Sequence, residues 1–195
     1  HKLFLIGKYI SKQQGKSIAK ILLVSGAFIS IIANWITAIP AMFLYFIWGI
    51  GYNHAPFEWK KTPIIGWLVN SFAGILLFII GWMLVMQNYH HTGIIPINVD
   101  ILAHMLPYVL CFSAVSLLTT LPDIRGDKAM GARTFPLEFG TTAPLLISLF
   151  MVSGALYVSI IHEDPIASTA TLVSLPFFIF AAIRRLNKDV LRAIR

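Results

Sequence analysis

Charged residues are scarce in this sequence, and acidic residues are the scarcest of them. Only 12% of the 195 residues are charged, with eight Asp and Glu against 15 Lys and Arg, whereas an ordinary soluble domain carries about a quarter charged residues. Apolar residues make up 57% of the chain, and its mean hydropathy is +0.79. This composition argues against a soluble globular enzyme and favours a membrane protein.

Cysteine is almost absent too. The single cysteine, Cys111, lies inside an apolar run, which excludes an intrachain disulfide framework. The formal net charge of +7 is typical of some nucleic-acid-binding proteins, but the basic residues are separated by long apolar runs and do not form one continuous patch. We therefore predict no nucleic-acid partner.

Long apolar runs are what the sequence has in abundance. Because a helix needs about 20 apolar residues to cross a bilayer, the chain has room for about six spans, at residues 17–34, 37–51, 64–86, 101–120, 143–161 and 166–183. The second run is short for a full crossing, and a re-entrant hairpin formed by the first two runs is the alternative there. The sequence predicts an all-α, polytopic transmembrane helical bundle that forms a single domain over residues 1–195.

The charges predict how this bundle is oriented. If all the runs cross, every Lys and Arg falls on one side of the membrane, and the loops on the other side carry only acidic charge. Cytoplasmic loops of membrane proteins are enriched in Lys and Arg, so we expect the basic loops in the cytoplasm, at the cytoplasmic membrane of a prokaryote. The chain starts at His1 and ends abruptly in a basic stretch, and we interpret it as an internal fragment of a longer protein.

One basic-side segment, residues 121–140, carries a pair of aspartates. Asp123 and Asp127 are four residues apart, which places both carboxylates on one face of a helix, where they repel each other unless a cation lies between them. Mg²⁺ commonly takes one or two carboxylates and completes its shell with water and substrate phosphate. The alternative is a solvated loop in which Arg125, Lys128 and Arg133 balance the acids without a metal.

A second basic-side segment covers residues 51–61. Lys60 and Lys61 are cationic donors suited to a diphosphate, and Tyr52 and Asn53 offer neutral hydrogen bonds. The alternative is that the two lysines and Trp59 only anchor the chain at the membrane interface, as at many membrane boundaries.

Together these segments resemble a known family. Asp123-x-x-x-Asp127, followed by Gly131 and Thr134-Phe135-Pro136, with a Tyr52-to-Lys60 loop two spans earlier, is similar to the UbiA-type intramembrane prenyltransferase superfamily. Members have about nine helices around a lipid-accessible cavity, with two Asp-rich cytoplasmic loops that bind a prenyl diphosphate through Mg²⁺. The resemblance implies that the six runs are helices three to eight, and that an earlier acidic motif stands just before His1. Thr119 and Thr120 stand where many relatives have Lys-Asp.

The resemblance also implies roles for individual residues. Asp123 and Asp127 would be the catalytic metal ligands for Mg²⁺. The diphosphate-binding residues would be Lys60, Lys61, Tyr52, Asn53 and Lys128.

The activity that follows is transfer of an isoprenyl group from its diphosphate to a lipophilic acceptor. An aromatic quinone precursor, a chlorophyllide-like alcohol, a glycerophosphate ether and a carotenoid are all compatible with the segment. Two other functions stay open at this point. One is a polytopic transporter or channel in which the Asp–Arg loop is a cytoplasmic gate, and the other is a non-catalytic membrane subunit.

Overall fold

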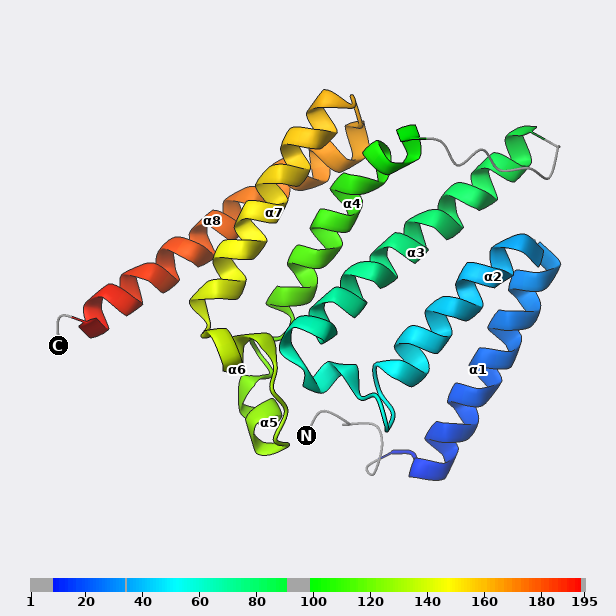
Figure 1. Cartoon of the computed structure of the whole chain (residues 1–195), viewed down its shortest axis with the longest axis horizontal. Helices are drawn as coiled ribbons and strands as arrows, with labels where there is room; N and C mark the ends of the chain where they lie inside the picture. The colour runs from blue at the N-terminus through cyan, green and yellow to red at the C-terminus, as the bar shows by residue number, and fades with distance from the viewer. Residues whose placement is uncertain (1–8, 34, 91–98, 194–195) are drawn as a thin grey trace. The chain divides into compact units, whose positions relative to one another are not determined.

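The computed structural model describes residues 9–33, 35–90 and 99–193. Within these ranges every regular element is a helix, and no strand occurs, which confirms the predicted all-α class. The elements, shown in Figure 1, are α1 (Lys12–Ala33), α2 (Trp35–Leu44), the π-helix η1 (Tyr45–Gly51), the 3-10 helix η2 (Trp59–Lys61), α3 (Pro63–His90), α4 (Val99–Leu118), α5 (Ile124–Ala129), α6 (Phe135–Phe139), α7 (Thr142–Ile161) and α8 (Pro165–Ala193).

Five of the helices in the described ranges are long and apolar enough to cross a membrane. The candidate spans are Gln13–Ala33, Pro63–Met86, Ile101–Leu118, Thr142–Ile161 and Pro165–Leu186. The second predicted run forms the shorter continuous helix Trp35–Gly51, as its length predicts. The predicted end of the last span at residue 183 is wrong for the helix, because α8 continues to Ala193 through basic residues that are good helix formers. The protein is an integral membrane protein with a helical bundle.

The chain divides into two compact units, His1–Phe43 and Leu44–Arg195. In the first unit, α1 begins at a capping box. The Gln14 backbone N–H donates to the Ser11 hydroxyl (3.1 Å), and the Ser11 backbone N–H donates to the side-chain carbonyl of Gln14 (2.8 Å). Residues 1–8, which the resemblance places directly after an earlier acidic motif, lie outside the described residues. That all of residues 1–195 form one domain stays a prediction.

In the second unit, α3, α4, α7 and α8 follow one another as antiparallel neighbours (Figure 1). Small residues form their contacts: Ala73 on α3, Ala114 on α4 and Ala155 on α7 are completely buried. The Ser148 hydroxyl of α7 donates to the Ala114 carbonyl of α4 (2.9 Å). Lipid provides no hydrophobic drive between helices, so small side chains that let backbones approach, and hydrogen bonds of this kind, hold such bundles together.

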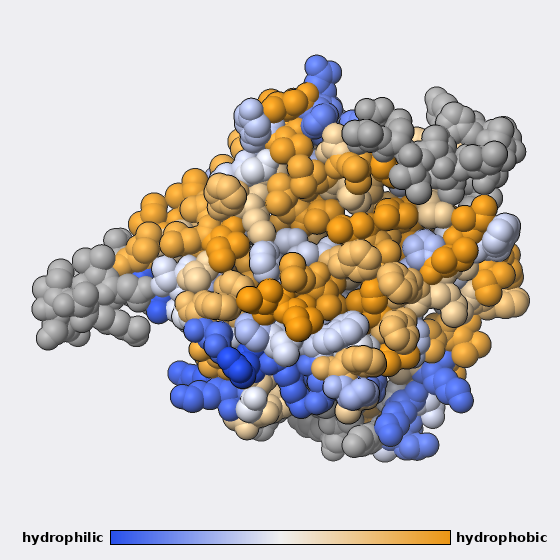
Figure 2. All heavy atoms as spheres, in the orientation of Figure 1, coloured by the Kyte–Doolittle hydropathy of each residue, from blue (hydrophilic) through white to orange (hydrophobic). Residues whose placement is uncertain are grey.

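Many large apolar side chains of the second unit are exposed, although others, such as Leu117 and Val152, are buried in its core. Phe150 on α7 is 80% exposed and Phe177 on α8 is 72% exposed. Figure 2 shows apolar atoms over the flank of these helices, and hydrophilic atoms gathered around the end at which α5 and α6 lie. This distribution suits helices whose flanks contact lipid chains and whose ends contact water.

The two ends of the second unit differ in charge, because basic groups gather at one of them, beside Glu58, Asp123, Asp127 and Glu138, and Asp164 lies at the other. The end formed by the connections before α3 and after α4 carries Lys60, Lys61, Arg125, Lys128 and Arg133. At the other end, Asp164 begins α8 by accepting hydrogen bonds from the Ile166 and Ala167 N–H groups (3.0 and 2.9 Å). Burial raises the pKa of Asp164, but the bonds from Ala167, the Tyr108 hydroxyl and Ile166 outweigh it, and this pKa is lowered overall.

Candidate functional site

Two loops meet at the basic end of the second unit. We call residues 52–62, between η1 and α3, the lysine loop, and residues 119–134, between α4 and α6, the aspartate loop. The Arg133 N–H donates to the Lys61 carbonyl (2.9 Å), which joins the two backbones directly. The Trp67 ring of α3 also contacts the Phe135 ring of α6 edge-on, with centroids 5.8 Å apart. The two segments singled out by the sequence are therefore neighbours in space.

In the aspartate loop, the two carboxylates lie one helical turn apart. Asp123 is the residue before α5, Asp127 lies within α5, and the Asp127 N–H donates to the Asp123 carbonyl (2.9 Å). Both side chains are partly exposed, as a metal-binding pair requires. No cluster of three or more His, Cys, Asp or Glu residues occurs within the described ranges. This donor set fits Mg²⁺ whose other ligands come from a substrate phosphate and water. It does not fit an ion bound by protein groups alone.

The threonines at the two ends of the aspartate loop differ. Thr119 and Thr120 donate their hydroxyls to the Ser116 and Leu117 carbonyls (2.9 and 2.6 Å), which satisfies the last turn of α4. The Thr134 residue is 8% exposed, and its hydroxyl has no hydrogen-bond partner within the described part of the chain. A buried hydroxyl without a partner is costly, so Thr134 is the polar group of this loop whose hydrogen-bonding capacity stays unused.

The lysine loop folds tightly over the start of α3. A Cβ on Gly51 would lie 2.2 Å from the Trp59 ring, and one on Gly66 would lie 2.9 Å from the Trp59 carbonyl, so only glycine permits this approach. Glu58 has φ +43°, in the left-handed region, which costs an L residue about 1–2 kcal/mol. The loop therefore has a fixed course, which sets where its lysines stand.

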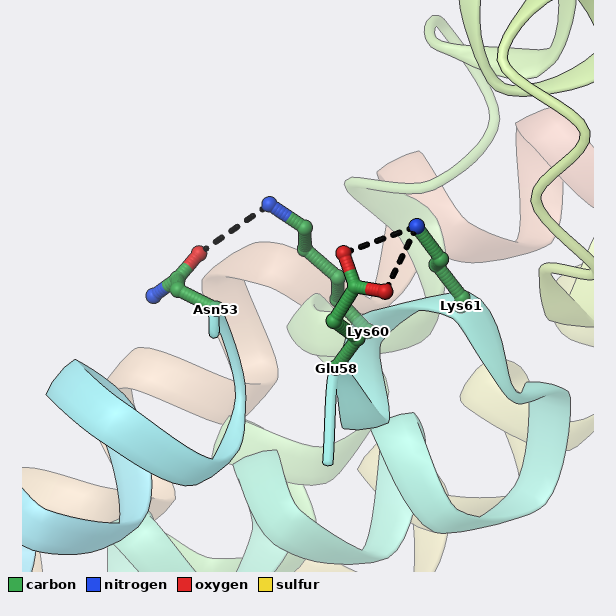
Figure 3. A network of polar contacts seen from close by, with 4 residues as sticks. All are labelled: Asn53, Glu58, Lys60 and Lys61. Carbon is green, nitrogen blue, oxygen red and sulfur yellow. Dashed lines mark hydrogen bonds and ion pairs between the residues drawn. The ribbon is translucent and has the colours of Figure 1, made fainter. Parts of the chain in front are cut away.

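The two lysines are not equivalent. Figure 3 shows the Lys60 and Lys61 side chains projecting from the same side of the loop, with the Glu58 carboxylate between them. The Lys61 ammonium lies 2.7 and 2.8 Å from the two Glu58 oxygens. The Lys60 ammonium donates to the Asn53 side-chain carbonyl at 3.3 Å, and within the described ranges it makes no ion pair. Lys60 therefore keeps a positive charge that no carboxylate in the described part of the chain neutralises.

Tyr52 and Asn53 belong to a hydrogen-bond network that reaches into the bundle. The Asn53 amide donates to the Trp48 carbonyl (2.7 Å), and the Lys60 N–H donates to the Tyr52 carbonyl (3.2 Å). Asn70 on α3 donates to the Tyr52 hydroxyl (3.3 Å) and accepts from the Trp48 indole N–H (2.8 Å). Sequence reasoning missed Asn70 and Trp48. The available signal was that Asn70 is the single amide side chain in the span Pro63–Met86.

The other basic groups of the aspartate loop differ in the same way as the lysines. The Arg133 guanidinium holds both oxygens of Glu138 (2.8 and 3.2 Å). Hydrogen bonding by Arg133, and then its charge, lower the pKa of Glu138. Arg125 and Lys128 are exposed on α5, and no ion pair involves them within the described ranges. Lys60, Arg125 and Lys128 are thus the cations at this end that no described carboxylate holds.

Comparison with known proteins shows the family of the chain. The profile of the UbiA prenyltransferase family matches residues 4–195. The chain belongs to this family. The match confirms the resemblance carried by the two loops.

Two curated proteins are similar to most of the chain. The chain is 27% identical over 191 residues to digeranylgeranylglyceryl phosphate synthase of Methanobrevibacter smithii, and the aligned region covers 92% of this chain and 63% of the relative. The chain is 23% identical over 158 residues to the bacteriochlorophyll synthase 34 kDa chain of Chloroflexus aurantiacus, and this second aligned region covers 74% of this chain and 48% of the relative. The chain therefore spans about half to just under two thirds of their lengths. No solved structure gives a significant match.

Proposed function

We propose that the protein is an intramembrane prenyltransferase that moves an isoprenyl group from its diphosphate to a lipophilic acceptor. The observation that carries this proposal is the hydrogen bond from Arg133 to Lys61, because it joins a carboxylate pair and an unneutralised lysine on neighbouring loops. Such a site suits a substrate that combines a diphosphate with a metal ion. Membership of the UbiA family supports the same reaction.

The reaction requires stabilisation of the negative charge that forms on the diphosphate leaving group. The bond between the allylic carbon and its oxygen breaks with both electrons going to the diphosphate, and the acceptor then bonds to that carbon and gives up a proton. Mg²⁺ held by Asp123 and Asp127 would supply positive charge to the departing oxygens. Lys60 and Lys128 would bind the remaining oxygens, with Lys61 shared between Glu58 and the substrate. Tyr52 and Asn53 would add hydrogen bonds.

The apolar helices would hold the rest of the substrates. An isoprenoid tail gains affinity by burial among them, and a lipophilic acceptor reaches the site from the bilayer. We place the protein as one domain in the cytoplasmic membrane of a prokaryote, with both loops on the cytoplasmic side, because the basic residues of the second unit gather at that end.

The test is diphosphate release by the complete protein in membranes, with farnesyl or geranylgeranyl diphosphate and a panel of lipophilic acceptors. Asp123→Asn and Asp127→Asn should each abolish Mg²⁺-dependent release without loss of membrane expression. Glu138→Gln is the matched control, because this nearby acid is engaged by Arg133 and should leave release unchanged. Full turnover in both aspartate variants refutes the proposal. Substrate flux in proteoliposomes that prenyl diphosphates do not affect would favour a transporter instead.

A further inference from the structure

Asn70 lies between Trp48 and Tyr52, and its amide can be oriented in only one way. An indole N–H donates and never accepts. The Asn70 atom 2.8 Å from the Trp48 indole nitrogen is therefore the carbonyl oxygen. The amide nitrogen must then face Tyr52, at 3.3 Å from its hydroxyl.

This orientation decides what the Tyr52 hydroxyl does. Its oxygen accepts a hydrogen bond from Asn70, so its own hydrogen is directed away from Asn70. Among the described residues, no acceptor is hydrogen-bonded to that hydrogen. The Tyr52 residue is only partly buried. It follows the end of η1, and its main-chain carbonyl accepts a hydrogen bond from the Lys60 N–H. Tyr52 thus offers a donor on the lysine loop.

The network is anchored in helix packing. The Trp48 ring lies 6.0 Å from the Phe112 ring of α4, and Phe112 fits against α3 because Gly74 has no side chain: a Cβ there would lie 3.0 Å from the ring. The Trp48 carbonyl also holds the Asn53 amide, whose oxygen accepts from Lys60. Asn70 is thus bonded to Trp48 and Tyr52, Trp48 packs in turn against α4, and the network joins the bundle interior to the lysine loop.

We infer that Asn70 is a positioning residue, which holds the Tyr52 hydroxyl as a hydrogen-bond donor directed at the diphosphate of the substrate. This inference rests on the proposed function. Asn70 acts through Tyr52, so it need not touch the substrate itself.

The experiment is a double-mutant cycle in the complete protein, with KM for geranylgeranyl diphosphate and kcat measured for Asn70→Leu, Tyr52→Phe and the double variant. Removing a hydrogen bond to a charged group lowers affinity by about tenfold or more. Each single variant should therefore raise KM about tenfold. We expect kcat to change little, because this bond is made to the bound substrate as well as to the transition state. The double variant should raise KM no further than Tyr52→Phe alone.

Ser71→Ala is the matched control on the same helix. Its hydroxyl bonds to the Trp67 carbonyl and to Ser113, outside the network, and its loss should leave KM unchanged. If the Asn70 and Tyr52 effects multiply, or if Asn70→Leu accumulates in membranes and leaves KM unchanged, the inference is overturned.

If Asn70→Leu does not accumulate in membranes, Asn70→Asp makes the same test. A carboxylate still accepts from Trp48 but cannot donate to Tyr52, so KM should rise at neutral pH and recover in acid, where the protonated carboxyl donates again. A KM that does not vary with pH overturns the inference.

Failure of the proposed function is distinguishable. In that case the wild type releases no diphosphate. The increase in thermal stability on adding inorganic pyrophosphate with Mg²⁺ can still be measured and compared between the wild type and Asn70→Leu. Equal protection of the two proteins overturns the role of Asn70, and weaker protection of the variant supports it.

Discussion

Replacing each lysine of the lysine loop by methionine should have very unequal effects on diphosphate binding. Lys60 has no carboxylate partner in the described ranges and donates at 3.3 Å to a neutral amide, so a phosphate can recruit its full charge. A hydrogen bond to a charged group contributes about 1.5–3 kcal/mol, which is roughly a 10- to 150-fold change in affinity. We therefore expect Lys60→Met to raise KM for a prenyl diphosphate within that range.

Lys61 should matter much less, because Glu58 already holds it. Its ammonium lies 2.7 Å from the carboxylate, and the two side chains are 43% and 36% exposed. A pair this exposed contributes about 1 kcal/mol or less, and a phosphate must compete with Glu58 for the same charge. Lys61→Met should raise KM no more than about fivefold, which is the effect of about 1 kcal/mol.

Glu58→Gln makes the comparison sharper. It removes the carboxylate that neutralises Lys61, so KM should fall in the single variant, and the double variant with Lys60→Met should be less impaired than Lys60→Met alone. The assay is KM in membranes at low and high salt, since exposed charges are screened by ions. Equal losses at Lys60 and Lys61, or no effect of Glu58→Gln in the Lys60→Met background, refute the assignment of Lys60 as the leading cation.

Two further predictions concern stability and the shape of the lysine loop. Asp164→Ala removes the acceptor at the start of α8 and should lower the free energy of unfolding by about 1 kcal/mol. Because the pKa of Asp164 is lowered from 3.8, the wild-type advantage should be present above about pH 4 and lost as the pH falls through the lowered pKa, which thermal unfolding in detergent would detect. Gly51→Ala would place a Cβ 2.2 Å from Trp59 and should raise KM for the diphosphate, whereas Gly81→Ala, with nothing within 4 Å, should not. An unchanged KM in Gly51→Ala, or no difference in stability at Asp164, contradicts these assignments.

Much of the fold could be predicted from the sequence, because membrane spans depend on local composition. Apolar runs near residues 64–86, 101–120 and 143–161 became α3, α4 and α7 with ends shifted by a few residues. The end of α8 was missed because hydropathy falls at Arg184 while helix propensity does not. Hydropathy marks where a helix leaves the hydrocarbon, and it does not mark where the helix ends.

The candidate site was predictable in part. Asp123 and Asp127 stood out because their spacing matches one helical turn, and the structure places them one turn apart at α5. Glu58 and Asn70 did not stand out, because neither belongs to a recognisable pattern. Glu58 acts by pairing with Lys61. Asn70 acts by contacting Tyr52 and Trp48, which lie 18 and 22 residues earlier in the chain, on the other side of the lysine loop. Such contacts depend on how the loop folds back.

By itself, the sequence determined that this protein is a membrane-embedded helical bundle, that its basic loops gather at one end, and which two loops carry the polar groups. These properties follow from composition and local spacing. Only the tertiary structure decided that the loops touch through Arg133 and Lys61, that Glu58 neutralises one lysine and leaves the other charged, and that Asn70 orients Tyr52. The physical reason is that hydrogen bonds and ion pairs act over a few ångströms, so they depend on which distant segments meet.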